Sequence, residues 1–381
     1  MNKAIKMSST QVNLFRLGRH CLSRRFNLPD PAYIASRMCG AQAQVLSAAE
    51  MSIGTRAEGM VASHVKHALL KERRLIKTWA MPGTLHLLAT EDLPLYVAAL
   101  GRPLKQNVAR WLDRRGLDHH ASDKLSDAIL KALKAGPLTR KELATKVCRL
   151  LGADAAEWIE HSWGGVVKCI ALEGHVCFGP NHGNNTTYVR VDKWVGDSER
   201  ISDNAGNMPQ DEASMELIRR YLKVYGPADM RDYCAWSGLR VREAKGPWQA
   251  LKDELVPVNA DGRSLWLLAE DMDALVATKI EPDIVRLLPN FDSYLLAHKN
   301  KDHIVHKDYY KQIYRSAGWI APVILTNGYA VGTWSYRRKS NRIQIELAPF
   351  EPLESNVWSM VKAEAEDLGR FLNTECEVML A

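Results

Sequence analysis

The stretch Gly136-Pro137-Leu138-Thr139-Arg140-Lys141-Glu142-Leu143 returns in altered form as Gly226-Pro227-Ala228-Asp229-Met230-Arg231-Asp232-Tyr233. A helical pattern precedes each copy, at Asp123–Lys134 and at Ser214–Tyr225. Two further helical patterns follow each copy, and a pair of strand-like runs ends it. The final runs are His175–Gly179 with Thr187–Val191, and Leu255–Val258 with Ser264–Leu268. The chain therefore contains an internal repeat.

The order helix, Gly-Pro turn, helix, helix and two-stranded wing is typical of a winged-helix unit. A looser copy occupies the N-terminal third and ends in strand-like runs around Ile76–Ala80 and Thr84–Leu88, joined by Met81-Pro82-Gly83. We expect three such units in series. The segment Asp197–Gln210, which contains a glycine and a proline, is predicted to be a linker before the third.

The composition changes from Ile284 onward, where β-branched and aromatic runs are broken by turns. Asn327-Gly328 is a strong hairpin signal, and a last helix is expected over Ser355–Asn373. The fold class is therefore α+β, with helical units followed by a small antiparallel β-domain. The predicted domains are residues 1–120, 121–200, 201–283 and 284–381.

The overall composition is that of a globular protein with an anionic partner. The 381 residues are 46% hydrophobic and carry a net charge of +7, a mild indication of nucleic-acid binding. Seven scattered cysteines suggest free thiols in a reducing compartment. With neither a signal-peptide pattern nor a long apolar run, we expect a cytoplasmic, nucleoid-associated protein with no membrane partner, and a monomer.

Signatures with fixed spacing exclude several enzyme classes. The chain has no Walker A loop, no dinucleotide-binding GxGxxG, no GxSxG and no HExxH. Cys169, His175, Cys177 and His182 match no common zinc spacing, so neither a metal nor another cofactor is expected. The neighbours His161 and Ser162 point apart and form no nucleophile–base pair. Asp292 is a minor candidate for a general base, although such a carboxylate more often binds nearby backbone N–H groups.

The segment Ala41–Met51, AQAQVLSAAEM, is the most informative candidate site. Ser47 and Glu50 have capping-box spacing, so a helix is predicted to begin just after Ser47 and to run until Gly59. Gln42 and Gln44 would precede it in extended chain, where an i, i+2 pair points to one side. Spacing alone favours a solvated or backbone-bonded pair of amides over a functional one.

Several sequence blocks resemble the AlkZ-like family of winged-helix DNA glycosylases. Gln42 and Gln44 match its Gln-x-Gln motif, and the segment 78–86, TWAMPGTLH, matches its Thr-Trp-x-Met-x-Gly-Thr-Leu-His block. GHVCFGP, RRYLKVYGPADMRDYCAWSGL, RLLPNFDSYLL and NGYAVGTW also resemble family blocks, in register over nearly the whole chain.

This resemblance implies three tandem winged helices followed by a β-barrel, forming a C-shaped channel for DNA. It implies a monofunctional glycosylase that hydrolyses the N-glycosidic bond of cationic alkylated purines, of the N7-alkylguanine type, in double-stranded DNA. Interstrand crosslinks are among the implied substrates, and the product is an abasic site. Gln42 and Gln44 are the implied catalytic residues. The alternative is a non-enzymatic winged-helix transcription regulator or damage-binding protein.

Two amides suit this chemistry because an N7-alkylated guanine is already positively charged and leaves without being protonated. A glutamine carbonyl accepts a hydrogen bond from a water and presents a negative dipole to the sugar, but it is no strong base. His86 and Thr84 are candidates for supporting groups, although a half-buried structural role is favoured for His86. Trp79 is expected in the core.

Clusters of basic residues are candidates for contacts to DNA phosphates, although a solvated surface is the commoner role of any one cluster. The tip Asn181–Asn185 is a candidate groove probe, and a plain surface turn is as good a description. The predicted DNA-binding residues are Arg73, Arg74, Lys77, Arg337, Arg338, Lys339 and Arg342.

Overall fold

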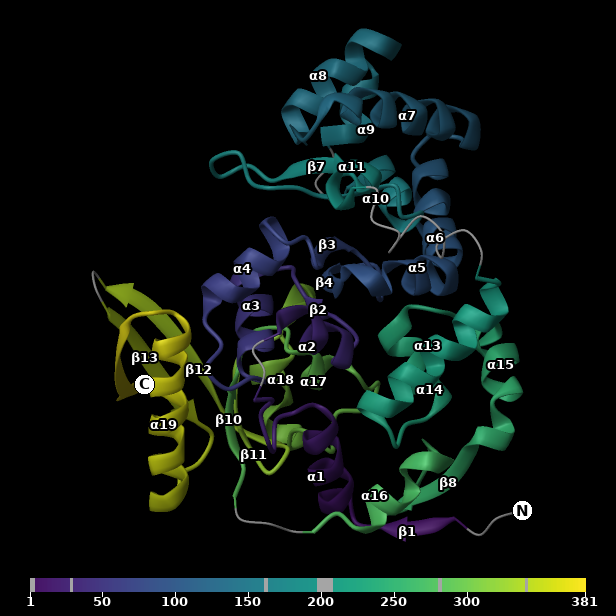
Figure 1. The fold of residues 1–381 in the computed structure, drawn as a ribbon. Helices are drawn as coiled ribbons and strands as arrows, with labels where there is room; N and C mark the ends of the chain where they lie inside the picture. The colour runs from purple at the N-terminus through teal and green to yellow at the C-terminus, as the bar shows by residue number, and fades with distance from the viewer. Residues whose placement is uncertain (1–3, 28–29, 161–163, 197–207, 280–282, 340–341) are drawn as a thin grey trace.

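The computed structural model describes residues 4–27, 30–160, 164–196, 208–279, 283–339 and 342–381. Helices and short sheets alternate along the chain (Figure 1). The helical part forms two bodies, and a sheet with one long helix lies beside the lower one in Figure 1. Within these residues, no helix combines the length and hydrophobicity needed to span a membrane.

The α-helices are α1 (Ser9–Arg19), α2 (Pro31–Arg37), α3 (Leu46–Gly54), α4 (Ala62–Leu70), α5 (Leu93–Tyr96), α6 (Arg102–Asp113), α7 (His119–Ala132), α8 (Arg140–Leu151), α9 (Ala155–Glu160), α10 (Gly165–Leu172), α11 (Val191–Val195), α13 (Gln210–Tyr225), α14 (Met230–Ser237), α15 (Val241–Ala250), α16 (Met272–Val276), α17 (Ser293–Leu296), α18 (Tyr310–Ile313) and α19 (Ser355–Phe371). The strands are β1 (Ile5–Met7), β2 (Ala41–Gln42), β3 (Leu75–Trp79), β4 (Leu85–Ala89), β5 (Leu138–Thr139), β6 (Val176–Phe178), β7 (Thr187–Arg190), β8 (Leu255–Ala260), β9 (Arg263–Leu268), β10 (Val285–Leu288), β11 (Val323–Thr326), β12 (Tyr329–Lys339), β13 (Arg342–Pro349) and β14 (Glu375–Leu380).

The two copies of the Gly-Pro repeat fold alike. After Gly136-Pro137, Thr139 caps α8 in a reciprocal capping box, and after Gly226-Pro227, Asp229 caps α14 in the same way. In both copies the residues between the proline and the cap pair with the second strand of the following hairpin, β7 or β9. This arrangement confirms that the repeat is structural.

The N-terminal third contains the same arrangement in a less regular form. Its hairpin is β3–β4, and the short strand β2 pairs with β4 just as β5 pairs with β7. The chain then enters α3, the counterpart of α8 and α14. The Gln-x-Gln segment thus begins on the short third strand of the first unit.

The first two hairpins form one six-stranded sheet, in the order β2-β4-β3-β6-β7-β5. The joint between them is the pair Lys77↔Phe178, which connects β3 to β6. The rings of Trp79, Phe178 and Tyr188 pack around this joint, with centroids 4.8 Å apart for Trp79 and Phe178. Trp79 is therefore half-buried and part of a core, as predicted.

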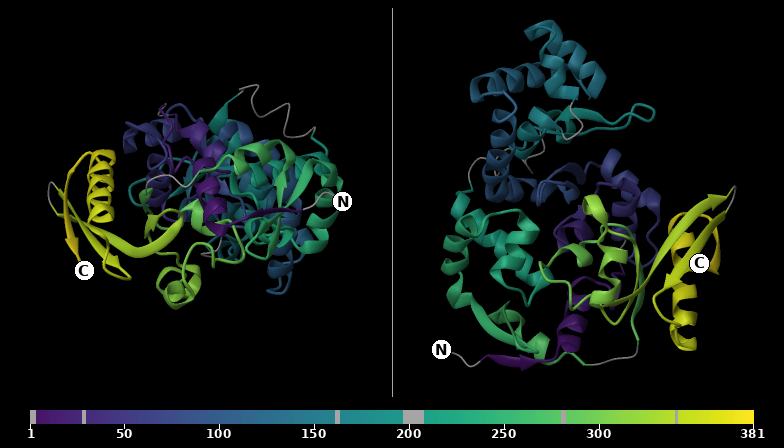
Figure 2. Two further views of the ribbon diagram at one scale, coloured as in Figure 1. Left: turned by 90° about the horizontal axis from the view of Figure 1, so that it is seen from below. Right: turned by 180° about the vertical axis from the view of Figure 1, so that it is seen from behind.

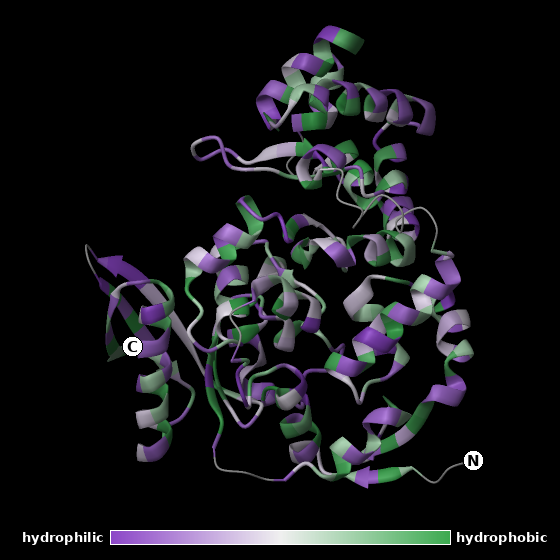
Figure 3. Ribbon diagram, in the orientation of Figure 1, coloured by the Kyte–Doolittle hydropathy of each residue, from purple (hydrophilic) through white to green (hydrophobic). Residues whose placement is uncertain are grey.

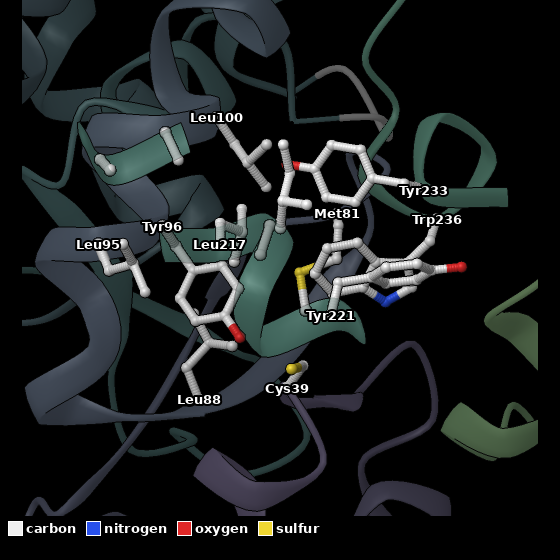
Figure 4. Close-up of a cluster of buried hydrophobic side chains, with 14 of the residues drawn as sticks. Cys39, Met81, Leu88, Leu95, Tyr96, Leu100, Leu217, Tyr221, Tyr233 and Trp236 are labelled. Carbon is white, nitrogen blue, oxygen red and sulfur yellow. The ribbon is translucent and has the colours of Figure 1, made fainter. Parts of the chain in front are cut away.

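The third hairpin, β8–β9, belongs to a separate sheet in which β1 from the N-terminal segment pairs in parallel with β8. Above it, a core cluster joins the first unit to α13 and α14. Figure 4 draws part of this cluster, with Cys39 and Leu88 close to Leu217, Tyr221 and Trp236. Cys39 shortly precedes the segment that carries the two glutamines, so this packing fixes where that segment starts.

The C-terminal region is an open sheet, and the expected β-barrel is wrong for the described residues. Its order is β10-β11-β12-β13-β14, so β10 and β14 are its edges. The chain leaves β13, passes through α19 and returns as β14, which pairs in parallel with β13. Because α19 packs on this sheet, its apolar side is covered by a helix and the sheet does not need to close on itself.

Two hairpins project from the same side of the molecule, as Figure 1 and the rear view in Figure 2 both show. One is the β6–β7 hairpin with its exposed tip at Asn181–Asn185, and the other is the far end of β12–β13. In both views α3 and α4 lie between them. Figure 3 shows that the far end of β12–β13 is hydrophilic. This side of the molecule therefore combines the glutamine segment with two protruding hairpins.

Candidate functional site

The two glutamines occupy the end of an edge strand and the bend that follows it. Gln42 is the last residue of β2 and pairs with His86 of β4. The backbone N–H of Ala43 still donates to the Leu85 carbonyl, at 2.6 Å, and the chain then turns at Gln44. The strand register therefore fixes Gln42, and Gln44 lies at the entrance to α3.

The helix after the glutamines begins earlier than predicted. Its N-cap is Val45, which makes no side-chain capping bond, and its first residue is Leu46, so the capping box expected at Ser47 and Glu50 is wrong. The helix also ends at Gly54 and not at Gly59. The reason is tertiary: Val45 and Leu46 pack against two hydrophobic clusters, which set the helix start without a polar cap.

The two glutamines differ in exposure. The Gln42 side chain is only 9% exposed, whereas Gln44 is exposed. Among the described residues, neither amide has a protein hydrogen-bond partner, and the amide of Gln42 is not fully enclosed. Both amides are therefore free to bind a water or a ligand.

Two polar residues of one short segment hold the glutamine segment on either side. The Ser293 hydroxyl donates to the carbonyl of Gly40, at 2.9 Å. Asp292 accepts from the Ser52 hydroxyl of α3, at 2.6 Å, and from Arg56 through two bonds of 2.8 Å. The Gly40 backbone before the glutamines and the side chains of Ser52 and Arg56 after them are thus tied to the start of α17.

Asp292 is not available as a general base. Its side chain is fully buried, and it also caps α17 by accepting from the Tyr294 N–H. Burial raises the pKa of Asp292, but the charge and hydrogen bonds of Arg56 outweigh that effect and hold the pKa below its ordinary value. The carboxylate is a permanently charged anchor, in line with the favoured interpretation of its sequence context.

His86 and Thr78 extend the row that begins at Gln42. Gln42 lies opposite His86 in the β2–β4 pair, and His86 lies opposite Thr78 in the β3–β4 pair. Directly opposed residues of antiparallel strands place their side chains on one face of a sheet. The three side chains therefore form a polar row across the strands, on the face that carries Gln42.

The row is buried and electrically neutral. His86 is 5% exposed, and burial lowers its pKa from 6.5 to about 4, so the ring is uncharged at neutral pH. Its Nδ1 lies 3.3 Å from the Thr84 carbonyl. Thr78 is 1% exposed, and its hydroxyl has no hydrogen-bond partner. Sequence reasoning missed Thr78, although the hairpin register around Met81–Gly83 would have placed it beside His86.

Thr84 does not share this role. Its hydroxyl donates to the Met81 carbonyl, at 2.9 Å, inside the turn that joins β3 to β4. The backbone carbonyl of Thr84 accepts from Ala80. We assign Thr84 to the turn that sets the position of His86.

The predicted basic clusters differ in how many of their side chains already bind other groups of the protein. Arg73 donates to the Trp194 carbonyl and lies over its ring, and Arg74 forms an ion pair with Asp30. Lys77 lies over the Phe178 ring and is half-buried, so that burial lowers its pKa. The strand register also places Lys77 on the opposite face of the sheet from Gln42.

The β12–β13 cluster is different, because Arg337, Arg338 and Lys339 are exposed and have no ion-pair partner among the described residues. Arg342 is also exposed and lies 3.7 Å from Glu377. This cluster is therefore the more available of the two for an external anion.

The remaining candidates contribute no site. Cys169 and Cys177 are buried thiols whose pKa is raised by desolvation, while His175 and His182 are exposed. In the residues that the structure covers, no group of three or more histidine, cysteine or acidic side chains is arranged to hold a metal ion. His161 and Ser162 lie outside the described residues.

Three comparisons agree on one family. The family model described as DNA glycosylase AlkZ-like matches residues 35–371. The interstrand DNA cross-link repair glycosylase of Streptomyces sahachiroi is 32% identical over 375 residues, covering 96% of this chain and 97% of the relative. The solved structure of Streptomyces sahachiroi DNA glycosylase AlkZ superposes with a TM-score of 0.85 at 28% identity, covering 99% of this chain and all of the other.

Proposed function

The chain belongs to the AlkZ-like DNA glycosylase family, and from this premise we propose that it hydrolyses the N-glycosidic bond of cationic alkylated purines in double-stranded DNA. N7-alkylguanine is the proposed adduct type, and the product is an abasic site. The relative named for interstrand crosslink repair extends the proposal to crosslinked purines. The observation that carries it is the pair of unbonded amides of Gln42 and Gln44.

The amides would act on the water and on the sugar. The side-chain carbonyl of Gln44 accepts a hydrogen bond from a water near the anomeric carbon. The amide of Gln42, which is the more buried of the two, makes a second hydrogen bond to the same water. The negative ends of the amide dipoles favour the positive charge that develops on the sugar. Because a neutral amide is a weak base, only bonds that are already weakened by a cationic base are cleaved quickly.

The neutral row behind Gln42 fits the same chemistry. An uncharged His86 offers one donor and one acceptor without placing a second positive charge beside the sugar. The unpartnered Thr78 hydroxyl offers a further donor and acceptor for an ordered water. We therefore propose His86 and Thr78 as positioning residues for Gln42 and its water.

The position of Lys77, the lysine on strand β3, supports a monofunctional reaction. Strand cleavage through a Schiff base would need a lysine amine at the sugar. Lys77 is on the other face of the sheet from Gln42 and lies over an aromatic ring. We propose that the enzyme stops at the abasic site.

The DNA is proposed to lie along the side from which the β6–β7 and β12–β13 hairpins project (Figures 1 and 2). The helix–hairpin units in residues 1–120, 121–200 and 201–283 would act as three winged helices, followed by the sheet domain in residues 284–381. The exposed Arg337, Arg338 and Lys339 would bind phosphates. A monomer is sufficient for this arrangement.

The test measures base release from duplex DNA that contains N7-methylguanine, followed by alkali treatment that breaks the strand at abasic sites. Wild-type protein should release the adduct, whereas Gln42→Ala/Gln44→Ala should release it at least a hundredfold more slowly in single turnover. Gln249→Ala, an exposed glutamine on α15, is the matched control and should be fully active.

Equal release by the double variant would remove the catalytic assignment. Binding of damaged DNA without release by the wild type would support the damage-binding alternative. Strand breaks that form without alkali or heat would contradict the monofunctional reaction.

A further inference from the structure

A cavity of about 490 Å³ lies between α3, the turn before β11 and the strands β12 and β13. Its lining combines aromatic and polar side chains, which include Met51, Asn290, Arg315, Trp319, Tyr336 and Glu346. Such a combination of flat apolar walls and a few polar groups is typical of small-molecule sites. Neither the glutamines nor the row behind them line this cavity.

The aromatic wall is exposed and rigid. Trp319 is 42% exposed, although tryptophan is strongly stabilised by burial. Its ring packs edge-to-face on the buried Phe291, with centroids 5.1 Å apart. Its backbone is held by a bond from the Arg315 N–H, at 2.8 Å, and the next residue, Ile320, accepts from the Asn290 amide. The exposed ring is therefore held ready for a partner.

The cavity also contains an unneutralised carboxylate. Glu346 accepts only a long bond from the Ser335 hydroxyl, at 3.4 Å, and it has no ion pair among the described residues. Asn290 donates its amide N–H to a carbonyl and keeps its own oxygen free of protein donors in the same residues. An acceptor-rich cavity beside the exposed Trp319 ring favours a planar cation.

A guanidinium lies at the same cavity. The Nε of Arg315 donates to the Gln312 carbonyl, at 3.0 Å, and no carboxylate pairs with this exposed side chain in the described part of the chain. Its remaining N–H groups are free donors that suit an anion such as a phosphate. The cavity thus presents groups for both parts of a nucleotide with a cationic base.

The cavity connects to the glutamine segment through packed side chains. Met51 belongs to α3, the helix that starts directly after Gln44 and Val45. Val45 packs against the cluster that contains Phe291, and the Phe291 ring packs on the Trp319 ring. A ligand that stacks on Trp319 is therefore held by the same packed unit that positions Gln44.

We infer that this cavity is a nucleobase subsite that takes one unstacked purine carrying a delocalised positive charge, with Trp319 and Tyr336 as its aromatic walls and Glu346 as its charge-selecting group. The inference rests on the proposed glycosylase function, and it adds a physical basis for substrate choice. A cationic purine gains from the ring faces and from the carboxylate, whereas a neutral purine gains only from stacking.

The probe is 7-methylguanosine at mildly acidic pH, where its base is cationic, with guanosine as the neutral comparison. Quenching of tryptophan fluorescence by the wild type should need a several-fold lower concentration of 7-methylguanosine than of guanosine. Trp319→Leu should remove most of the quenching. Glu346→Gln should keep quenching but make the two nucleosides about equal.

Trp358→Leu is the matched control, because Trp358 lies on α19 with Lys362 over its ring and is not among the residues that line the cavity. It should leave the response to both nucleosides unchanged. Circular dichroism and the melting temperature establish that each variant is folded. If wild type and Trp319→Leu respond alike, or if the wild type shows no preference for the cation, the subsite is refuted.

The failure of the subsite is distinguishable from the failure of the function. Gln42→Ala/Gln44→Ala should bind 7-methylguanosine like the wild type while losing base release from DNA. If that variant still releases the base, the catalytic assignment is wrong and the subsite stands. If release from DNA is normal in Trp319→Leu and Glu346→Gln at limiting and saturating enzyme, the subsite is overturned and the glycosylase function stands.

Discussion

Thr78 lies directly opposite His86 across the β3–β4 hairpin, and its buried hydroxyl has no hydrogen-bond partner. A buried hydroxyl without a partner costs about 1–3 kcal/mol. Thr78→Val removes that cost while conserving shape, so we expect it to raise the free energy of unfolding by about 1 kcal/mol. If the hydroxyl instead orders a water for Gln42, it is satisfied, and the same change should bring no gain in stability and should slow base release at least tenfold.

Thr326→Val provides the control, because Thr326 of β11 also has a buried, unpartnered hydroxyl and lies in another sheet. It should be stabilising and fully active. Denaturant unfolding and single-turnover release measure the two quantities. Normal release by Thr78→Val would show that its hydroxyl is merely unsatisfied.

The neutral state of His86 predicts a flat pH profile for base release. Because its pKa in the folded protein is about 4, the ring does not titrate between about pH 5 and pH 8. The enzyme-dependent rate, corrected for spontaneous depurination, should show no inflection near 6.5. An inflection there that disappears in His86→Gln would contradict the buried neutral ring.

The same shift predicts how stability depends on pH. The folded pKa lies below the unfolded value of 6.5, so the unfolded chain binds the proton first. Stability is therefore full above pH 6.5 and falls as the pH drops towards about 4, by up to about 3 kcal/mol for this group. His86→Gln should show a smaller loss of unfolding free energy than the wild type between these two pH values.

Gly40 is required by two separate features. Its φ is +88°, and an added Cβ would lie 2.6 Å from the Leu88 Cδ2 and 3.4 Å from the His86 ring. Gly40→Ala should destabilise the protein by about 1–3 kcal/mol and reduce base release, because either β2 or the buried Leu88 side chain beside His86 must shift to relieve the clash. Gly59→Ala, with φ of +65° and open space around it, separates backbone strain from the clash. Equal effects of the two changes would rule out the clash.

Substitutions at Asp292 and Ser293 should distinguish the effect of an unpaired buried charge from the effect of a lost backbone anchor. Asp292→Asn leaves the buried Arg56 without its partner, so a loss of about 3–5 kcal/mol is expected. Ser293→Ala removes one bond to Gly40 and should cost only about 1 kcal/mol, yet it should slow base release by freeing the backbone before Gln42. Denaturant melts and release rates test both changes. Full activity of Ser293→Ala would contradict its role as an anchor.

The β12–β13 cluster of basic residues should control the salt dependence of DNA binding. Arg337→Ala/Arg338→Ala/Lys339→Ala should flatten the slope of log affinity against log salt by about 0.9 for each phosphate that the three side chains neutralise. Arg242→Ala/Lys245→Ala on α15 removes exposed charges from the opposite side in Figure 1 and should leave the slope unchanged. Arg73→Ala should mainly affect stability, because its guanidinium is bound to Trp194. An unchanged slope in the triple variant would remove this hairpin from the DNA interface.

Local signals predicted the elements well where local forces decide them. The Gly-Pro turns with their caps and the Asn327-Gly328 hairpin are set by residues a few positions apart. The signals failed where distant segments meet. The parallel strands β1 and β14 and the joint between β3 and β6 leave no local pattern. The barrel was implied by the family resemblance, and in the described residues the sheet is instead open with α19 packed on it.

The candidate site was predictable in its residue types but not in its surroundings. Gln42, Gln44 and His86 were named from the sequence and from the family resemblance. Their different exposure and the contacts to Asp292 and Ser293 depend on a segment some 250 residues away, as the Ser293–Gly40 bond spans 253 positions. The capping box predicted at Ser47 and Glu50 was wrong because the packing of Val45 and Leu46, and not a polar cap, sets the start of helix α3.

The joint between β3 and β6 is one residue pair wide, with a small aromatic cluster around it. The joint is not the whole connection, because Lys168 donates to the Gly83 carbonyl, at 2.6 Å, and Arg73 donates to the Trp194 carbonyl, at 2.7 Å, so the outer hairpin is fixed to the first at several points. Thr78 lies between Lys77, which forms the joint, and Trp79, which packs on it. A force that a bent duplex placed on the outer hairpin would therefore act within one residue of Thr78, the side chain that faces His86.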